Sequence, residues 1–545
     1  MKNICWILFV IIILTFLAYL PIFRGFFQHD EWIAFGQYLP AGKNLLSFFR
    51  PAVAHYVPLQ QLLFYLYVSV FKLNFFWYAL FSVLAHLIVV CLSFIFFSSL
   101  LKNRILISII ASLFFALAAS GHQATSWIAA DINTHGSVIF GLLALIVLYN
   151  FNKIWLSIIF LITSLLFKEA TVAFFIILPL MIYIFDKRRF LKNWVSYLKI
   201  PLVGFSYLLF RFSMFFFQRA NVEDQIVTET QSLFDIIVNI VTFPAKIFSQ
   251  SIIPSGQLLS LAKSITKILP TGISGLYGTT AFDVYTEQVT LQILNWTIFL
   301  VGLLVLIYFG RKAKNGIVKK TAAFGFIFAV LNSYIYVLSP GRSGNISVID
   351  SRNIYLPSLG AFLFLVSIIF ILSKNKIIKT LLILLPLLFL NIFWLEKELA
   401  FMANRGTERK QILYQIKSLY PTLPEKTVFY MVSDTSFYGL PESEKMFPFE
   451  TNFGYTLMVW YLPTEHFSRV LVNQPGFLYQ LTDEGYKEDE ERGFGYFRNF
   501  DLMIKAVQEN KLQEESIIAY RYDSSSKNLI DITGQVREEI GMVSE

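Results

Sequence analysis

Charged residues are scarce in this chain. Asp, Glu, Lys and Arg make up 15% of its 545 residues, whereas they average about 25% in soluble globular domains. Hydrophobic residues reach 56%, and apolar runs of roughly 20 residues, the length that crosses a hydrocarbon core, recur between Ile4 and Trp394. This composition excludes a soluble protein, favours membrane lipids over nucleic acid as the surroundings, and predicts an integral membrane protein with many spans.

Three other absences narrow the chemistry. Cysteine occurs only as Cys5 and Cys91, both inside apolar runs, so neither a disulfide framework nor a zinc site is expected. The chain has no Asp-x-Asp pair, and its six histidines are not spaced as metal ligands. Glycine-rich phosphate loops are also missing, which argues against a nucleotide-driven pump. We therefore expect no metal ion and no other cofactor.

Eleven apolar segments are predicted to be membrane-spanning helices. They lie near residues 4–23, 75–99, 105–120, 134–150, 154–168, 170–185, 194–217, 292–310, 321–338, 354–373 and 377–395. The first run lacks a small-residue cleavage site before Arg24, so it is interpreted as an uncleaved helix and not as a signal peptide.

The basic residues indicate how these helices are oriented. With a cytoplasmic N-terminus, Lys and Arg fall in every inner connection, for example five of them between Arg311 and Lys320, as the positive-inside rule requires. The C-terminus is then extracytoplasmic, and we expect a multi-pass protein of a bacterial-type plasma membrane. Much of the net charge of +9 is accordingly a signal of orientation and not a binding surface.

Residues 1–395 are predicted to form an all-α membrane domain with two long outer loops, 24–74 and 218–291. Within the second loop, 232–253 is apolar but interrupted by charged residues and a proline, so it is interpreted as an amphipathic or re-entrant segment. Two aromatic-rich helical patches in the first loop suit the headgroup interface; they are Trp32 to Leu39 and Leu59 to Phe71.

From Glu396 onward the composition becomes charged and mixed. Residues 396–545 are predicted to form an extracytoplasmic α/β domain, since about 150 residues suffice for one small domain. The pattern predicts a helix over 396–417, a strand over 426–433, and a hairpin built from 516–523 and 528–533.

Two adjacent carboxylates, Asp30 and Glu31, follow the first span by about seven residues. A carboxylate near the membrane interface can act as a general base on a hydroxyl, because a low dielectric raises its pKa towards a useful value. The alternative is an ordinary polar loop in which both carboxylates meet water. The flanking His29 and Trp32 favour a site.

Cationic residues occur at two further outer positions. Arg352 stands at the entrance to the tenth span, where its planar guanidinium suits a phosphate; alternatively it snorkels or pairs with Asp350. Tyr355 is either an interface anchor or a hydrogen-bond donor to the same ligand. In the turn Lys168-Glu169 the two charges are neutralised by nearby partners, or Lys168 faces an anionic headgroup. The remaining candidates for lining a substrate cavity are His29, His55, Tyr56, His122, Asp131 and Glu169, although lone histidines more often have structural roles.

Four motifs occur in order on the predicted outer side: Asp30-Glu31, Tyr-x-Pro-Leu at Tyr56 to Leu59, Lys168-Glu169, and Arg-x-x-Tyr-Leu-Pro-Ser at Arg352 to Ser358. This set resembles the GT-C superfamily of membrane glycosyltransferases, especially the protein O-mannosyltransferases and the transmembrane O-mannosyltransferases that act on cadherins. The resemblance covers about residues 1–395.

The resemblance implies an inverting hexosyl transfer from a polyprenyl-phosphate-linked sugar, without a nucleotide sugar or ATP. Asp30 would be the base, with Glu31 as its electrostatic or hydrogen-bonding support. Arg352, Lys168 and Tyr355 would hold the donor phosphate. The acceptor hydroxyl could belong to a protein, a lipid or a glycan.

The chain also departs from the family pattern. Val57 replaces the usual Arg, Gly121-His122-Gln123 lacks the usual His-Pro, and Asp131 stands where an Arg is expected. The tail lacks the repeat array of the cadherin-directed members. Two other functions stay open: a transporter or flippase for a lipid-linked sugar, and an inactive GT-C-like protein whose tail binds partners.

Overall fold

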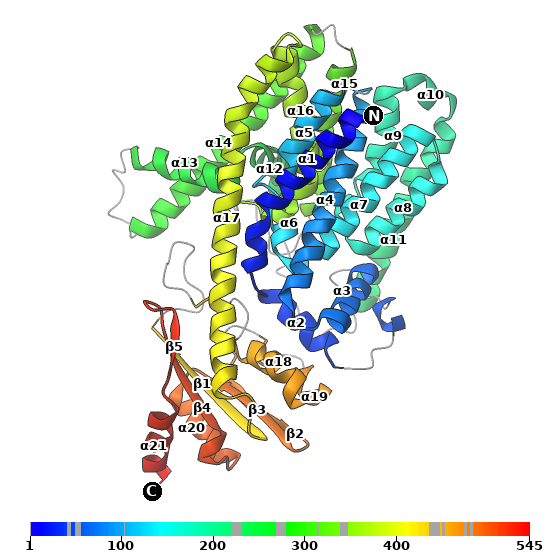
Figure 1. Cartoon of the computed structure of the whole chain (residues 1–545). Coiled ribbons are helices and arrows are strands. Elements are labelled where there is room, and N and C mark those ends of the chain that lie inside the picture. The colour runs from blue at the N-terminus through cyan, green and yellow to red at the C-terminus, as the bar shows by residue number, and fades with distance from the viewer. Residues whose placement is uncertain are drawn as a thin grey trace. The chain divides into compact units, whose positions relative to one another are not determined.

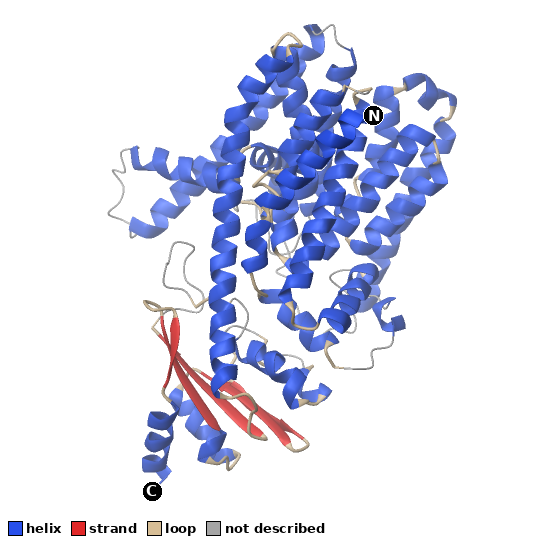
Figure 2. Cartoon of the chain, viewed as in Figure 1, coloured by secondary structure: helices blue, strands red, loops and turns tan. Residues whose placement is uncertain are grey.

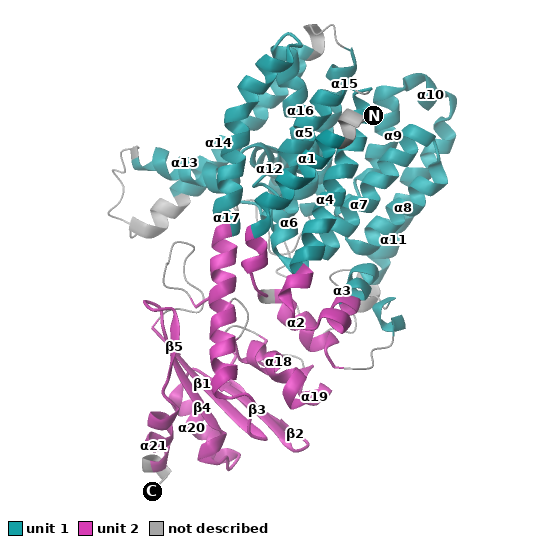
Figure 3. Ribbon diagram, in the orientation of Figure 1, with its two compact units in different colours: residues 1–20, 45–64, 79–399 teal, residues 21–44, 65–78, 400–545 magenta. Residues whose placement is uncertain are grey.

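The computed structural model is mostly helical, with one small sheet near the C-terminus (Figure 2). It describes residues 2–40, 45–49, 56–102, 104–219, 232–268, 279–312, 316–337, 347–434, 447–449, 453–473, 477–479 and 483–544. The chain divides into two compact units (Figure 3). Unit 1 comprises Met1–Leu20, Leu45–Phe64 and Ala79–Leu399, and unit 2 comprises Pro21–Asn44, Tyr65–Tyr78 and Ala400–Glu545.

Unit 1 is a helical bundle (Figure 1). Its α-helices are α1 (Lys2–Ala18), the first half of α3 (Pro58–Phe71), α4 (Phe75–Leu100), α5 (Ile105–Ala116), α6 (Gln123–Ser126), α7 (Ile128–Phe151), α8 (Ile154–Phe167), α9 (Phe174–Phe185), α10 (Lys187–Lys192), α11 (Trp194–Arg219), α12 (Leu233–Ile252), α13 (Ser255–Ile268), α14 (Thr279–Lys312), α15 (Gly316–Ser333), α16 (Ser351–Leu372) and the first part of α17 (Ile377–Leu419). Short 3-10 turns of unit 1 lie at Leu45–Phe49, Glu169–Thr171 and Tyr334–Tyr336, and another at Leu20–Arg24 leads from unit 1 into unit 2.

Helix α16 lies at the centre of this bundle. Its apolar residues join those of α4, α5, α7 and α9 in one extended core cluster. It also packs closely on α15 through two facing glycines, because a Cβ at Gly360 would lie 2.5 Å from the carbonyl oxygen of Gly325. Small residues permit such close approach between membrane helices. The start of α16, which carries Arg352, is therefore fixed to a rigid part of the unit.

Eight helical segments in the described part of the chain are long and apolar enough to cross a membrane. They are Trp6–Arg24, Phe75–Leu100, Ile128–Phe151, Trp194–Met214, Leu233–Ile252, Thr286–Phe309, Ser351–Leu372 and Ile377–Leu419. Seven of them coincide with predicted spans, so the prediction of a multi-pass membrane protein agrees with the structure. Three other predicted spans correspond to shorter apolar helices, namely α5, α8 and Glu169–Phe185. The remaining one, 321–338, begins in α15 and continues through the 3-10 turn Tyr334–Tyr336, and α15 is not among the eight.

Helix α12 differs from the expectation for 232–253, because it is one continuous helix that qualifies as a span by length and composition. Its two halves have different surroundings. Leu233 and Phe234 in the first turn are exposed, whereas every residue from Phe243 to Ile252 is buried. Figure 1 shows α12 nearly along its axis at the centre of the bundle, so α12 runs across the direction of α4 and α7.

Unit 2 contains a five-stranded sheet with the order β2-β3-β1-β4-β5. The strands are β1 (Lys426–Ser433), β2 (Gly485–Asp489), β3 (Arg492–Phe497), β4 (Ile517–Asp523) and β5 (Asn528–Asp531). β1 pairs in parallel with β3 and β4, while β2 and β5 pair antiparallel at the edges. The predicted strand at 426–433 and the predicted hairpin β4–β5 are confirmed; the hairpin β2–β3 is additional.

Helices cover both faces of this sheet. The helices are α18 (Phe453–Glu465), α19 (Arg469–Val472), α20 (Phe500–Glu509) and α21 (Thr533–Ser544). Val428 faces the core formed with α20 and α21, whereas the next residue, Phe429, contacts Tyr461 of α18. The predicted helix 396–417 forms the last part of α17, and Gln415 bonds the backbone of Leu529 in β5.

Part of the first loop belongs to unit 2. Helix α2 (His29–Tyr38) packs on α18, and its Trp32 ring lies 6.3 Å from the Trp460 ring, centroid to centroid. Trp32 and Phe35 are fully buried in this aromatic cluster. The aromatic residues of Trp32 to Leu39 therefore pack inside a folded unit, and the prediction that this patch faces the headgroup interface is wrong.

Candidate functional site

The segment from Ser120 to Ser137 organises the polar residues of unit 1. The one-turn helix α6 ends at Ser126, and Trp127 follows in an extended conformation before α7 begins at Ile128. This break lets the side chains of α6 and α7 point to different neighbours. Contacts from this segment reach most of the predicted site residues of unit 1.

Arg352 lies against Trp127, in the middle of this segment. The carbon of its guanidinium is 4.2 Å from the centroid of the Trp127 ring, and one of its nitrogens is 3.7 Å from Asp350 Oδ2. Its side chain is 29% exposed. The pairing of Arg352 with Asp350 is therefore present, and the Trp127 ring lies against the guanidinium. That Arg352 binds a phosphate stays a prediction.

Gln123 links α6 to the first turn of α16. Its backbone N–H donates to Ser351 Oγ at 3.3 Å, and its Oε1 accepts from the backbone N–H of Arg352 at 3.4 Å. Gln123 of α6 therefore binds Ser351 and the backbone of Arg352. The position of Arg352 thus depends on this backbone contact as well as on the contact of its side chain with Trp127.

A buried cluster of imidazole, carboxyl and phenol groups lies where α4, α7 and α16 meet. His135 Nδ1 is hydrogen-bonded to Asp131 Oδ1 one turn earlier on α7. The His135 ring contacts Tyr355 edge-on at 5.1 Å, and Tyr355 Oη is 2.7 Å from His86 Nδ1. Since His86 Nε2 lies 3.2 Å from the Ala116 carbonyl, a neutral His86 donates there and accepts from the Tyr355 hydroxyl. Tyr355 is therefore buried and bonded to protein, and neither role predicted for it, interface anchor or donor to a ligand, describes its contacts.

The turn Lys168-Glu169 separates its two charges. Lys168 Nζ donates to Asn133 Oδ1 at 3.4 Å and to Thr134 Oγ1 at 3.5 Å, both on α7. Glu169 forms an ion pair with Arg211 of α11 at 3.2 Å. Glu169 is thus neutralised by a distant residue. Lys168 contacts α7, and the residue that precedes α7, Trp127, lies against Arg352.

His122 precedes α6 and lies outside the helices that qualify as spans. Its Nδ1 is 3.2 Å from Ser126 Oγ, and its Nε2 is 4.0 Å from Glu398 Oε2. Burial lowers the pKa of His122 to about 4, because the imidazolium would lose its hydration. His122 is therefore a neutral, partnered histidine at physiological pH.

The acidic pair lies in unit 2, at the start of α2. Glu31 is buried, and its Oε2 accepts from the backbone N–H of Gln28 at 3.2 Å, which completes a capping box at the helix N-terminus. Asp30 is only partly buried in the first turn. Glu31 thus has a structural task that explains its presence, and Asp30 is the more accessible carboxylate.

The remaining predicted site residues are Tyr56, His29 and His55. The ring of Tyr56 packs edge-on against Phe210 of α11 at 5.6 Å. His29 belongs to α2, but its side chain lies outside the described part of the structure, as does the whole of His55. In the described residues, no group of three or more His, Cys, Asp and Glu side chains is arranged to hold a metal ion.

Three contributing residues escaped the sequence analysis: His86, Arg211 and Glu398. His86 and Arg211 are single polar residues within apolar runs, and such a residue inside a span is itself a signal of function. Glu398 had no signal, because its partner His122 lies more than 200 residues away in the sequence.

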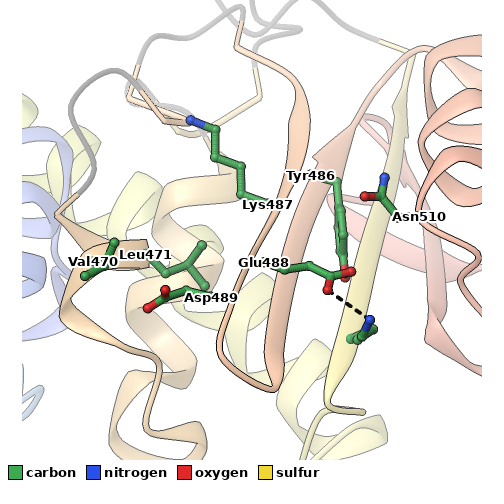
Figure 4. Close-up of a pocket in the computed structure, with 8 residues that line it drawn as sticks. Val470, Leu471, Tyr486, Lys487, Glu488, Asp489 and Asn510 are labelled. Atoms are coloured by element: carbon green, nitrogen blue, oxygen red, sulfur yellow. Dashed lines mark hydrogen bonds and ion pairs between the residues drawn. The ribbon is translucent and has the colours of Figure 1, made fainter.

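Unit 2 carries a hollow of its own at the edge strand β2 (Figure 4). Its volume is about 560 Å³, and its lining residues are Lys426, Val470, Leu471, Tyr486, Lys487, Glu488, Asp489 and Asn510. Lys426 and Glu488 form an ion pair across it at 2.9 Å, and Tyr486 Oη donates to Glu488 Oε1 at 2.8 Å. Its charges are therefore largely matched within the protein.

No protein-family model matches the chain, and a search of curated proteins finds no match.

Proposed function

We propose that this protein is an integral-membrane glycosyltransferase that moves a hexose from a polyprenyl-phosphate donor to an acceptor hydroxyl on the outer face. The observation that carries the proposal is the contact of two cations with one short stretch of chain. Arg352 stacks on Trp127, and Lys168 donates to Asn133 and Thr134, so residues 127–134 lie beside both positive charges. The indole N–H of Trp127 has no hydrogen-bond acceptor among the described residues and is a further donor for an anion.

Two cations suit this reaction because of how its charge changes. The donor is a phosphodiester with one negative charge, and the leaving polyprenyl phosphate carries close to two. Groups that bind the second charge more tightly than the first stabilise the transition state more than the bound substrate. Arg352 and Lys168 are proposed to supply this stabilisation.

Asp30 is proposed to accept the proton of the acceptor hydroxyl. The acceptor oxygen then forms a bond to the anomeric carbon while the bond from that carbon to the phosphate oxygen breaks, which inverts the anomeric configuration. A positioned base typically contributes about 10²–10⁴-fold to such a step. No metal, nucleotide sugar or ATP takes part in this scheme.

The experiment is an assay of purified protein in lipid with radiolabelled polyprenyl-phosphate sugars and a panel of peptide, lipid and glycan acceptors. We expect transfer from at least one donor, with an inverted anomeric centre in the product, and no transfer by Arg352→Ala. A wild-type protein that transfers no sugar from any of these donors would refute the proposal.

One observation favours a second candidate function, the transport of a lipid-linked sugar across the membrane. His86, Asp131 and His135 are buried within helices that qualify as spans, where ionisable residues often mark pathways for substrates or protons. Liposomes that contain the protein and a fluorescent polyprenyl-phosphate sugar distinguish the two functions. Movement of the label between leaflets without a glycosylated product would favour transport.

A further inference from the structure

Residues 347–350, which lead into α16, form no regular secondary structure. Their backbone groups still need hydrogen-bond partners, because they lie within a mostly apolar bundle. Side-chain amides from two helices supply these partners. The side-chain Oε1 of Gln288 in α14 accepts from the Ser347 backbone N–H at 3.3 Å. The backbone carbonyl of Gln288 accepts from Ser347 Oγ at 2.9 Å.

Gln250 of α12 makes the most extensive of these contacts. Its Nε2 donates to the Ser347 carbonyl at 2.6 Å, and its Oε1 accepts from the Ile349 N–H at 3.0 Å. The carboxamide thus pairs with this backbone as a neighbouring strand would. Gln250 is fully buried, and its Nε2 is also 3.4 Å from Asn295 Oδ1, so neighbouring residues hold its orientation.

This contact ends three residues before Arg352. On the other side of Asp350, Gln123 accepts from the Arg352 N–H and binds Ser351. Two glutamines from separate helices therefore hold the backbone on both sides of Asp350. Neither side chain is bonded to the Arg352 guanidinium, so any effect they have on a ligand passes through the backbone.

We propose that Gln250 is a positioning residue for Arg352: by holding Ser347 and Ile349, it fixes where the guanidinium meets an anionic phosphate. The inference rests on the proposed function, because it takes Arg352 as the residue that binds the donor phosphate. It assigns the buried half of α12 a role in donor binding that neither its apolar character nor its length indicates.

The test compares three variants of the full-length protein. Gln250→Met keeps the length and approximate volume of the side chain but removes both hydrogen bonds to the backbone. Gln123→Met does the same on the other side of Asp350. Asn332→Leu is the matched control, since Asn332 is a buried amide of α15 whose side chain donates to the Phe328 carbonyl within its own helix.

The first measurement is hydrogen exchange of the peptide that contains Ile349, which needs no enzyme activity. Gln250→Met should accelerate exchange at Ile349 by about tenfold or more, as expected when a buried amide loses its acceptor. Asn332→Leu should leave this exchange unchanged. Unchanged exchange in Gln250→Met would show that the contact does not hold the segment, and would overturn the inference.

The second measurement is binding of farnesyl phosphate, together with KM and kcat for the active donor. Gln250→Met should weaken farnesyl phosphate binding and raise the donor KM by about tenfold, with a smaller change in kcat. Gln123→Met should act in the same direction. The double variant should lose less than the product of the two single effects, because both act through one segment.

Two outcomes separate this inference from the proposed function. If wild-type protein binds farnesyl phosphate through Arg352 but transfers no sugar, the glycosyltransferase proposal fails, and the binding and exchange data still test the role of Gln250. If Gln250→Met exchanges faster at Ile349 yet binds farnesyl phosphate as the wild type does, Gln250 supports the backbone only, and the inference fails. An equal loss of binding in Asn332→Leu would also overturn it.

Discussion

The guanidinium carbon of Arg352 lies 4.2 Å from the centre of the Trp127 ring, although 225 residues separate the two in the sequence. An arginine stacked in this way keeps its nitrogens directed outward along the ring plane, where a phosphate can reach them. The stack also connects the α6–α7 segment to the start of α16. Arg352 is therefore oriented before any ligand arrives.

This stack predicts a specific pattern of donor binding. Trp127→Leu should raise the donor KM by about 2- to 30-fold, since a cation–π contact contributes roughly 0.5–2 kcal/mol. Arg352→Lys should raise it by at least about tenfold, because an ammonium has neither the planar face nor the paired donors. In the Arg352→Lys background, Trp127→Leu should add little. Fully additive effects in this double-mutant cycle would show that the two residues act independently.

Replacing each of the two acidic residues at the start of α2 should have a different effect, one on turnover and the other on stability. Asp30→Asn preserves shape and should reduce turnover by about 10²–10⁴-fold, the usual contribution of a general base, while donor binding stays near that of the wild type. Glu31→Gln should reduce turnover less than Asp30→Asn does. Because Glu31 is buried in a capping box, its replacement should instead lower the apparent Tm. Full turnover by Asp30→Asn would remove Asp30 as the base.

Adding a methyl group to α2 at Gly36 should lower the stability of unit 2. A Cβ at Gly36 would lie 2.0 Å from Tyr455 Oη of α18, so Gly36→Ala should destabilise unit 2 by about 1–3 kcal/mol, as overpacking typically does. Tyr455→Phe removes the clashing oxygen and should restore much of the loss. Thermal unfolding of the single and double variants measures both effects.

Two other glycines supply controls for that prediction. A Cβ at Gly406 would lie 2.4 Å from the backbone nitrogen of Phe26, and no side-chain change can relieve this clash. Gly406→Ala should therefore stay destabilised in the Tyr455→Phe background. Gly534→Ala, where a Cβ meets no atom within 4 Å, should unfold at or above the wild-type temperature. A destabilised Gly534→Ala variant would contradict the steric explanation.

His122 predicts a dependence of stability on pH. Its pKa in the folded protein is about 4, below its ordinary value of about 6.5, so the unfolded chain binds more protons between these values. Stability should therefore fall as the pH drops from about 6.5 to 4, by up to about 1.4 kcal/mol per pH unit, and this contribution should level off at lower pH. His122→Gln should reduce the slope of apparent Tm against pH in this window. A slope equal to that of the wild type would mean that other groups cause it.

The elements that were predicted correctly from the sequence are those whose own residues show a clear apolar pattern. The long, mostly apolar runs at 75–99 and 354–373 match α4 and α16, and the apolar strand at 426–433 matches β1. The hairpin β2–β3 was missed because all five residues from Lys487 to Glu491 are charged, a composition that is typical of a loop. Charged residues are, however, a usual feature of an edge strand, and β2 is at the edge of the sheet.

The candidate site was only partly predictable for a related reason. Asp131 and His135 are four residues apart on a helix, so their contact follows from local geometry. The contacts of Gln123 with Arg352 and of Glu169 with Arg211 depend on which helices pack together. The apolar pattern of one helix does not show which other helix packs against it. The sequence therefore singled out Arg352 and Glu169 without identifying their partners.

The inclusion of part of the first loop in unit 2 constrains the membrane topology. Residues 21–44 and 400–545 contribute to one compact unit, so they must lie on the same side of the bilayer, and the chain between them must cross it an even number of times. The seven long apolar helices between them, from Phe75–Leu100 to Ile377–Leu419, make an odd number. One explanation is that one of these helices enters and leaves the bilayer on the same side, as α12 with its exposed apolar first half would do. The other is that an odd number of the shorter apolar helices also cross the bilayer, which makes the number of crossings even.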